Sequence, residues 1–92
     1  MSIEIACAAL AAGRVLDVTY EGAPIRVEVH SAGYSGEDPQ VYCWQISPAD
    51  AVGWRLLRLG KAAAMALSDD ASGAPRPGYR PGDSIDRVVC CI

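Results

Sequence analysis

The sequence contains no apolar run that approaches the roughly 18 residues of a membrane-spanning helix. No lysine or arginine precedes the alanine-rich stretch near the N-terminus, and Glu4 lies close to its start. A secretory signal peptide begins with a basic segment. We therefore expect no membrane association and predict a cytoplasmic protein.

Metal-binding and catalytic motifs are also missing. His30 is the only histidine, the cysteines show no CxxC spacing, and no glycine-rich phosphate loop is present. A zinc site needs four converging ligands, and an enzyme needs a nucleophile with a base, paired carboxylates in a cleft, or a metal. We therefore predict a non-catalytic protein without a cofactor. A Cys43–His30 pair across neighbouring strands is the one catalytic alternative.

The four cysteines agree with a reducing compartment. Two of them are adjacent in the chain, so they cannot both point to one face of a strand. We predict reduced cysteines that pack as small hydrophobic residues, with a disulfide framework or a metal site as the alternative. These cysteines are Cys7, Cys43, Cys90 and Cys91.

The sequence does contain enough apolar residues for a packed core. Its 92 residues suit a single domain over residues 1–92, and 51% of them are hydrophobic. The net charge of −3 is uneven, because residues 1–54 have a balance of −5 and residues 55–92 a balance of +2. Nucleic-acid-binding proteins are usually basic overall, so a local basic patch in the second part is the remaining basis for such binding.

Hydrophobic periodicity predicts one helix followed by strands. Residues 2–12 have a helical apolar stripe, with Ser2 as the N-cap and Gly13 at the left-handed C′ position. From there the apolar period changes to two, and a short turn at residues 21–24 indicates a hairpin. Strands are predicted over residues 14–20, 25–30, 41–46, 54–59 and 85–92, with loops at residues 33–39 and 69–84. We expect Trp44 and Trp54 to lie in the core.

Residues 61–67 (KAAAMAL) are ambiguous. Alanine, methionine, leucine and lysine favour a helix, yet the stretch is short and follows a strand directly across Gly60. One helix followed by about five short strands predicts a mostly β fold, a small barrel capped by a helix.

Motifs along nearly the whole chain resemble the WYL-domain group, in particular its short single-domain relatives. The helix ending in ALAAGRVLDVTYEG resembles the start of those proteins. IRVEVHSAGYS, QVYCWQIS and GWRLLRLGKAAAM resemble their successive strands, and RPGYRPGDSIDRVVCCI resembles their ending. The Trp-Tyr-Leu triplet that names the group is replaced by Pro39, Gln40 and Val41.

The resemblance implies an Sm-like five-stranded barrel over residues 14–92, after a helix at residues 2–12. It also implies that residues 62–67 form a strand after a tight turn at Gly60, and we follow it there because tertiary pairing overrides propensity over so short a stretch. WYL domains occur in bacterial transcription regulators and defence proteins, where they sense a ligand, often nucleic acid. The chain has no room for a DNA-binding helix-turn-helix.

One strand has three polar residues that point to the same face. Arg26, Glu28 and His30 lie at i, i+2 and i+4, within reach of one ligand. Arg26 would bind an anion bidentately, and His30 would add a donor near neutral pH. The alternative is a solvated face in which Glu28 pairs with its neighbours.

Two further groups are candidates. Arg55 and Arg58 differ by three positions, so they form one phosphate-binding patch only if a bulge or curvature intervenes. Tyr79, between Arg76 and Arg80, would stack on a base, or would pin the loop onto the barrel. The predicted ligand-binding residues are therefore Arg26, Glu28, His30, Arg55, Arg58, Tyr79 and Arg80.

Two functional hypotheses follow. The first is a WYL-like module that senses a ligand or binds nucleic acid, with single-stranded nucleic acid or a small anionic molecule as its partner. The second is an interaction protein whose barrel edge or helix pairs with itself, as a homodimer, or with another protein. The net acidic charge and the lost aromatic triplet favour the second, and small domains gain stability by dimerising.

Overall fold

The computed structural model describes residues 3–79 and 85–92. Helix α1 (Glu4–Ala12) begins two residues later than predicted, and the predicted cap Ser2 lies outside the described residues. Gly13 ends the helix with a φ of 65°, and its N–H bonds to two helix carbonyls, as predicted for a C′ glycine. No helix among these residues is long and apolar enough to cross a membrane.

Six strands follow the helix within the described residues, and all their pairings are antiparallel. They are β1 (Arg14–Tyr20), β2 (Ala23–Ser35), β3 (Asp38–Ser47), β4 (Gly53–Arg58), β5 (Ala62–Ala71) and β6 (Arg87–Cys91). The 3₁₀ turn η1 (Ala49–Ala51) joins β3 to β4, and η2 (Leu59–Lys61) joins β4 to β5. The predicted mostly β fold with an N-terminal helix is confirmed.

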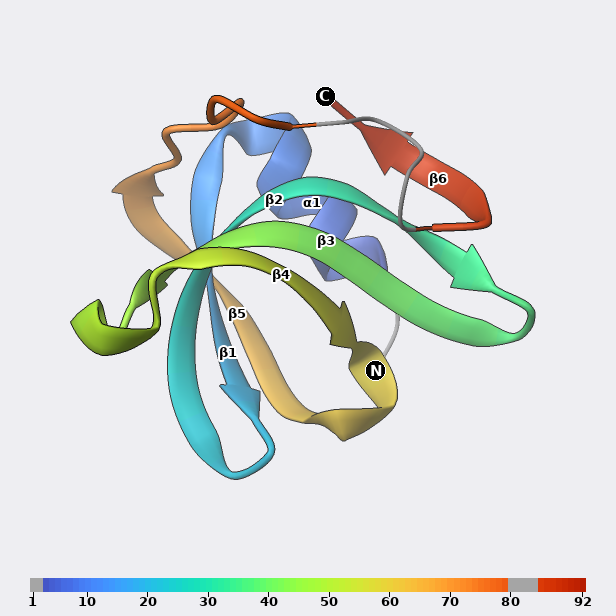
Figure 1. The fold of residues 1–92 in the computed structure, drawn as a ribbon, viewed down its shortest axis with the longest axis horizontal. Coiled ribbons are helices and arrows are strands. Elements are labelled where there is room, and N and C mark those ends of the chain that lie inside the picture. The colour runs from blue at the N-terminus through green and yellow to red at the C-terminus, as the bar shows by residue number, and fades with distance from the viewer. Residues whose placement is uncertain (1–2, 80–84) are drawn as a thin grey trace.

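The strands form one curved, open sheet (Figure 1). Its order is β4-β3-β2-β1-β5, and β6 pairs with the second half of β2. Among the described residues β4 and β5, at the two ends of this order, share no ladder, so the closed five-stranded barrel predicted for residues 14–92 does not form. β2 is thirteen residues long and pairs with β1 in its first half and with β6 in its second half.

The β2–β3 hairpin is longer than predicted. Residues 33–39 were predicted as a loop, but only Gly36 and Glu37 form a turn, and the other residues belong to β2 and β3. Gly36 has a φ of 63° in this turn, a conformation that glycine adopts without steric cost. Gly33 is required for another reason, because a Cβ there would lie 2.0 Å from the carbonyl oxygen of Arg87 in β6. Composition indicated a loop here, but pairing with β6 and β3 stabilises strand.

The strand predicted for residues 62–67 is confirmed, against their helical propensity. Residues Ala64 to Leu67 pair in regular register with Thr19 to Leu16 of β1. β5 then continues to Ala71, into the segment predicted as a loop. A two-turn helix is marginal in isolation, so the long ladder with β1 decides the conformation.

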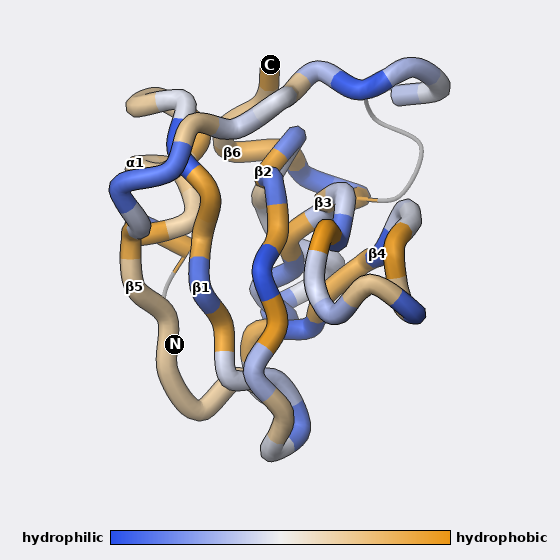
Figure 2. Tube along the Cα trace, turned by 90° about the vertical axis from the view of Figure 1, so that its left-hand side faces the viewer, coloured by the Kyte–Doolittle hydropathy of each residue, from blue (hydrophilic) through white to orange (hydrophobic). Residues whose placement is uncertain are grey.

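The core lies between the inner face of the sheet and α1. Hydrophobic and hydrophilic residues alternate along β1 and β2 (Figure 2), so that one face of each strand is apolar. Ala6 and Ala9 of α1 are fully buried, and α1 packs on β1 and β2. The buried cluster consists of Ile3, Ala6, Ala9, Leu16, Val18, Tyr20, Ile25, Val27, Val29, Ala32, Val41, Cys43, Leu57 and Leu59.

A disulfide joins Cys7 of α1 to Cys90 of β6, with a Cα–Cα distance of 5.9 Å. The prediction of four reduced cysteines was therefore wrong for this pair, whereas Cys43 is a buried free thiol and Cys91 an exposed one. The two partners are 83 residues apart in sequence and become neighbours because α1 and β6 both pack on β2. Disulfides persist in oxidising compartments and are rare in the cytoplasm, so this bond counts against the predicted location.

We expect the double variant Cys7→Ser/Cys90→Ser to be destabilised by about 2–5 kcal/mol, because a long loop of the unfolded chain is no longer closed. Urea unfolding without reductant measures the difference. Cys91→Ser is the matched control, since Cys91 is exposed and unbonded, and its midpoint should equal that of the wild type. Equal midpoints for all three proteins would show that the bond does not form in solution.

Candidate functional site

Arg26, Glu28 and His30 share the outer face of β2, as their spacing predicts. The structure does not bring them to one ligand site. Glu28 and His30 are 2% and 0% exposed, because residues 72–79 cover them, whereas Arg26 turns toward β1 and β5. The alternative of a solvated face is therefore wrong for Glu28 and His30.

Glu28 anchors the covering segment 72–79 through its carboxylate. The Arg76 side chain donates to it twice, from Nε at 2.6 Å and from Nη2 at 3.1 Å, and the Gly73 N–H donates to Oε2. Burial by itself favours the neutral carboxyl, but these hydrogen bonds and the charge of Arg76 outweigh burial and lower the pKa of Glu28. The carboxylate is thus charged at neutral pH and fully engaged within the chain.

His30 is a buried, neutral ring. Its Nδ1 lies 2.9 Å from the carbonyl oxygen of Glu28, and the Arg76 N–H donates to Nε2 at 2.9 Å. Because a backbone N–H only donates, we assign the proton to Nδ1. Burial lowers the pKa of His30, so both ring nitrogens are occupied by the protein at neutral pH, and neither is offered to a ligand.

Four rings form an aromatic cluster beside His30: Tyr42, Trp44, Trp54 and Tyr79. Tyr42 and Trp54 stack with centroids 5.1 Å apart, and Trp44 meets Trp54 edge-on at 5.2 Å. Both tryptophans are partly exposed and lie outside the buried core cluster, which corrects their prediction as core residues. The cause is register, since Trp44 pairs with Trp54 across β3 and β4 on the face opposite the core.

Tyr79 pins segment 72–79 onto the sheet. Its hydroxyl donates to the carbonyl oxygen of His30 at 3.2 Å, and its ring packs against Trp54. Arg76 places its guanidinium carbon 5.9 Å from the centre of the Trp44 ring. Of the two readings of this loop, the geometry favours the tyrosine that holds the loop in place. Arg80 lies outside the described residues.

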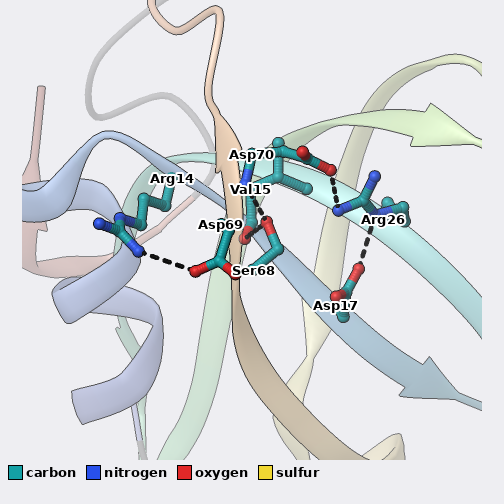
Figure 3. Close-up of polar contacts among 7 residues, drawn as sticks. All are labelled: Arg14, Val15, Asp17, Arg26, Ser68, Asp69 and Asp70. Carbon is teal, nitrogen blue, oxygen red and sulfur yellow. Dashed lines mark hydrogen bonds and ion pairs between the residues drawn. The ribbon is translucent and has the colours of Figure 1, made fainter.

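Arg26 is held between two carboxylates from neighbouring strands (Figure 3). Its Nε donates to Asp17 Oδ1 at 2.7 Å, and its Nη2 lies 2.7 Å from Asp70 Oδ2. Asp17 faces Arg26 because the two residues are paired in the β1–β2 register. The charge that was predicted to bind an anion is therefore already balanced.

The position of Asp70 depends on an irregularity in β5. The β1–β5 register shifts after Leu67, and there the Ser68 hydroxyl donates to the carbonyl of Val15 at 2.8 Å while accepting from the Asp70 N–H at 3.2 Å. The neighbouring Asp69 points the other way and pairs with Arg14 at 3.3 Å (Figure 3). One serine thus directs two carboxylates to two arginines.

A groove of about 440 Å³ lies beside Arg26 on the face shared by β5, β1 and β2. Small side chains make it possible, above all Thr19, Ala64 and Ala66. The guanidinium at its end is compensated by Asp17 and Asp70, so the groove has no free positive charge. Its lining consists of Asp17, Val18, Thr19, Pro24, Ile25, Arg26, Ser47, Ala64, Met65 and Ala66.

Arg55 and Arg58 lie on opposite faces of β4. The β3–β4 register runs without a shift, so no bulge turns them to one side. Arg55 donates to Gln45 Oε1 at 2.8 Å and covers the Tyr20 ring at 5.0 Å, whereas Arg58 pairs with Asp38 at 2.8 Å. The predicted phosphate patch does not assemble from these two residues.

Cys43 and His30 are not a catalytic pair. Cys43 points into the core and burial raises the pKa of its thiol to about 12, while the His30 ring packs on Trp54 and Tyr79, on the outer face. Within residues 3–79 and 85–92, no three histidine, cysteine, aspartate or glutamate side chains gather in a group that could hold a metal ion.

Sequence reasoning missed Asp17, Asp70 and the anchoring role of Arg76. A signal for Asp17 was present, because a two-residue turn after Tyr20 places it opposite Arg26, whereas we predicted a turn of four residues. Asp70 and Arg76 come from segments far along the chain. No local pattern assigns them their partners.

We compared the chain with family models, with curated proteins and with solved structures. No family model, curated protein or solved structure matches it. A function therefore has to come from the chain's own residues and contacts.

We expect Glu28→Gln to lower the free energy of unfolding by about 1–3 kcal/mol, because the amide cannot accept all three hydrogen bonds and leaves a buried donor facing a donor. Urea denaturation at neutral pH measures this loss. Glu37→Gln is the matched control, since Glu37 lies exposed in the β2–β3 turn and should unfold like the wild type.

The difference in stability between the wild type and Glu28→Gln also depends on pH. A carboxyl whose pKa is lowered by folding stabilises the chain above its unfolded pKa, about 4.3, and this contribution is lost as the pH falls through the folded pKa. The wild type should therefore lose its advantage over Glu28→Gln in acid. A difference that is already absent at neutral pH would contradict the anchoring role of Glu28.

Proposed function

We propose that this chain is a non-catalytic interaction module that binds an extended protein segment along an open edge of its sheet. β5 carries this proposal, because it pairs with β1 on one side and with no described strand on the other. Such an edge presents unpaired N–H and C=O groups to a further strand. Ala63, Ala64 and Ala66 are exposed and small, so no bulky side chain shields the backbone.

The charges favour a protein partner over a phosphate. Arg26 and Arg58 are held by carboxylates of the same chain, and Arg55 by an amide. A phosphate would have to displace these partners, and beside Arg26 it would face two carboxylates at close range. Like charges in contact oppose binding. Sheet-edge pairing needs no such displacement, because it uses backbone groups.

We also propose that the fold is an open form of the Sm-like barrel. The strand order β4-β3-β2-β1-β5 supports this, together with the short 3₁₀ turn η2 that leads from β4 directly into β5. The WYL-like assignment remains a proposal that rests on the sequence motifs. A cytoplasmic location is likewise a proposal that rests on the sequence, and the Cys7–Cys90 disulfide is the observation against it.

A second candidate function is binding of single-stranded nucleic acid or a small anionic ligand by the aromatic cluster. The observation in its favour is the partial exposure of Trp44 and Trp54 on the outer face, with the Arg76 guanidinium beside Trp44. Bases stack on such rings, and arginine adds a cation. Tyr42 already stacks on Trp54, which leaves less ring surface for a base and places this candidate second.

Selection of a random-peptide library against the immobilised full chain tests the interaction module. We expect the selected peptides to be extended, and to slow amide hydrogen exchange along a sheet edge, β5 above all, because β-addition engages backbone groups. The aromatic cluster should keep its exchange rates.

Labelled single-stranded RNA and DNA, titrated by fluorescence anisotropy across a salt series, provide the opposing result. Binding that weakens linearly on a log–log salt plot and that Trp54→Ala abolishes would transfer the function to the aromatic cluster. Peptides that protect only this cluster, or a library that yields no binder, would contradict edge binding.

A further inference from the structure

The outer edge of β5 is open at the side of the molecule. Figure 2 shows β5 at one margin of the sheet, with β1 beside it and no described element beyond it. Its residues are mostly exposed, including Leu67 at 39%. Edge strands normally carry charges, prolines or bulges that prevent pairing, so the side chains of β5 indicate whether this edge is protected.

From Ala64 to Leu67, β5 has none of these protections. Residues Ala62 to Leu67 contain no charge and no proline, and Ala64 to Leu67 form an unshifted ladder with β1. The register shifts between Ala62 and Ala64, and again between Leu67 and Ala71. The regular edge is therefore only a few residues long, and it can pair with an equally short, apolar stretch of a partner strand.

Charged residues of opposite sign lie on the two sides of the uncharged segment 62–67. Lys61 precedes it and Asp69 follows it, at equal distances from Met65. Lys61 is exposed and forms no ion pair with any other described residue. The Asp69 side chain is fully exposed and touches Arg14 only at 3.3 Å. Each end could therefore accept a partner of opposite charge without breaking a buried contact.

We propose that β5 pairs with β5 of a second copy of this chain, antiparallel about a two-fold axis at Met65. This register places Ala64 opposite Ala66 of the second copy, and it directs Lys61, in the turn η2, toward the Asp69 end of that copy, twice by symmetry. A two-fold interface requires such self-complementarity. The sequence around Met65 is self-complementary in this sense, because Lys61 lies four residues before Met65 and Asp69 lies four residues after it.

The groove face supports the same arrangement. A two-fold axis perpendicular to the sheet keeps the same face of both copies on one side, so the two grooves become neighbours. Ala64 and Ala66 line the groove and would meet at the junction, where their small side chains allow the strands to approach to ladder distance. This inference rests on the proposed function and names its partner as a second copy.

Sedimentation velocity of the full chain over a concentration series tests the pairing, in the Cys91→Ser background so that the exposed thiol cannot create dimers. We expect a dimer whose dissociation constant rises about tenfold in Lys61→Glu, because two attractive pairs become repulsive. Arg87→Glu changes the charge equally at an exposed site on β6 and should leave the dimer intact. Lys61→Glu/Asp69→Lys should restore it.

A single-chain mass at every concentration would overturn the pairing. So would a dimer that Lys61→Glu leaves unchanged, or one that the charge swap does not restore. These results would leave the interaction module standing if peptides selected from the library still bind a sheet edge. Failure of both experiments would remove the proposed function as well.

Discussion

The outer face of this molecule depends on one buried carboxylate. Glu28 projects from β2 on the side away from the core, where it would be solvated if nothing covered it. Its hydrogen bonds from Gly73 and Arg76 bring residues 72–79 across the sheet, and Arg76 then completes the pairing of His30. A charge with all its partners in place is tolerated in the interior, whereas the same charge without them is expensive. The Glu28–Arg76 pair therefore holds the cover over β2 in place, together with Tyr79 at its end.

In this arrangement the ionisable and aromatic side chains that were candidates for binding interact with other groups of the same chain. The single histidine, the buried glutamate and most arginines are engaged by groups of the same chain, and the rings of the aromatic cluster pack on one another. The backbone at the margins of the open sheet remains available to a partner. The outer edge of β5 is the longest of these margins without charge or proline, over residues Ala62 to Leu67. A structure of this kind recognises another strand more readily than it recognises an anion.

Much of this fold can be predicted from local hydrophobic periodicity, whereas the rest depends on long-range contacts. Local apolar spacing is enough to predict the helix before Gly13, the strand from Arg14 to Tyr20 and the inward face of β2. The conformation of residues 62–67 could not be decided by propensity, because pairing with β1 outweighs it. The Cys7–Cys90 bond and the burial of Glu28 could not be predicted from the sequence, because each depends on contact between segments that are far apart along the chain. The candidate site was predicted on the correct strand face but with the wrong exposure, because nothing in the sequence around Arg26, Glu28 and His30 shows that residues 72–79 will cover two of them.

The central claim is that the free edge of β5 pairs with β5 of a second copy. Hydrogen exchange of the β5 amides, measured on the wild-type chain at a high and a low concentration, tests it most directly. If the edge pairs with a second copy, exchange at residues Ala62 to Leu67 slows at the higher concentration, while exchange in β6 does not change. Exchange rates in β5 that are the same at both concentrations would contradict the claim.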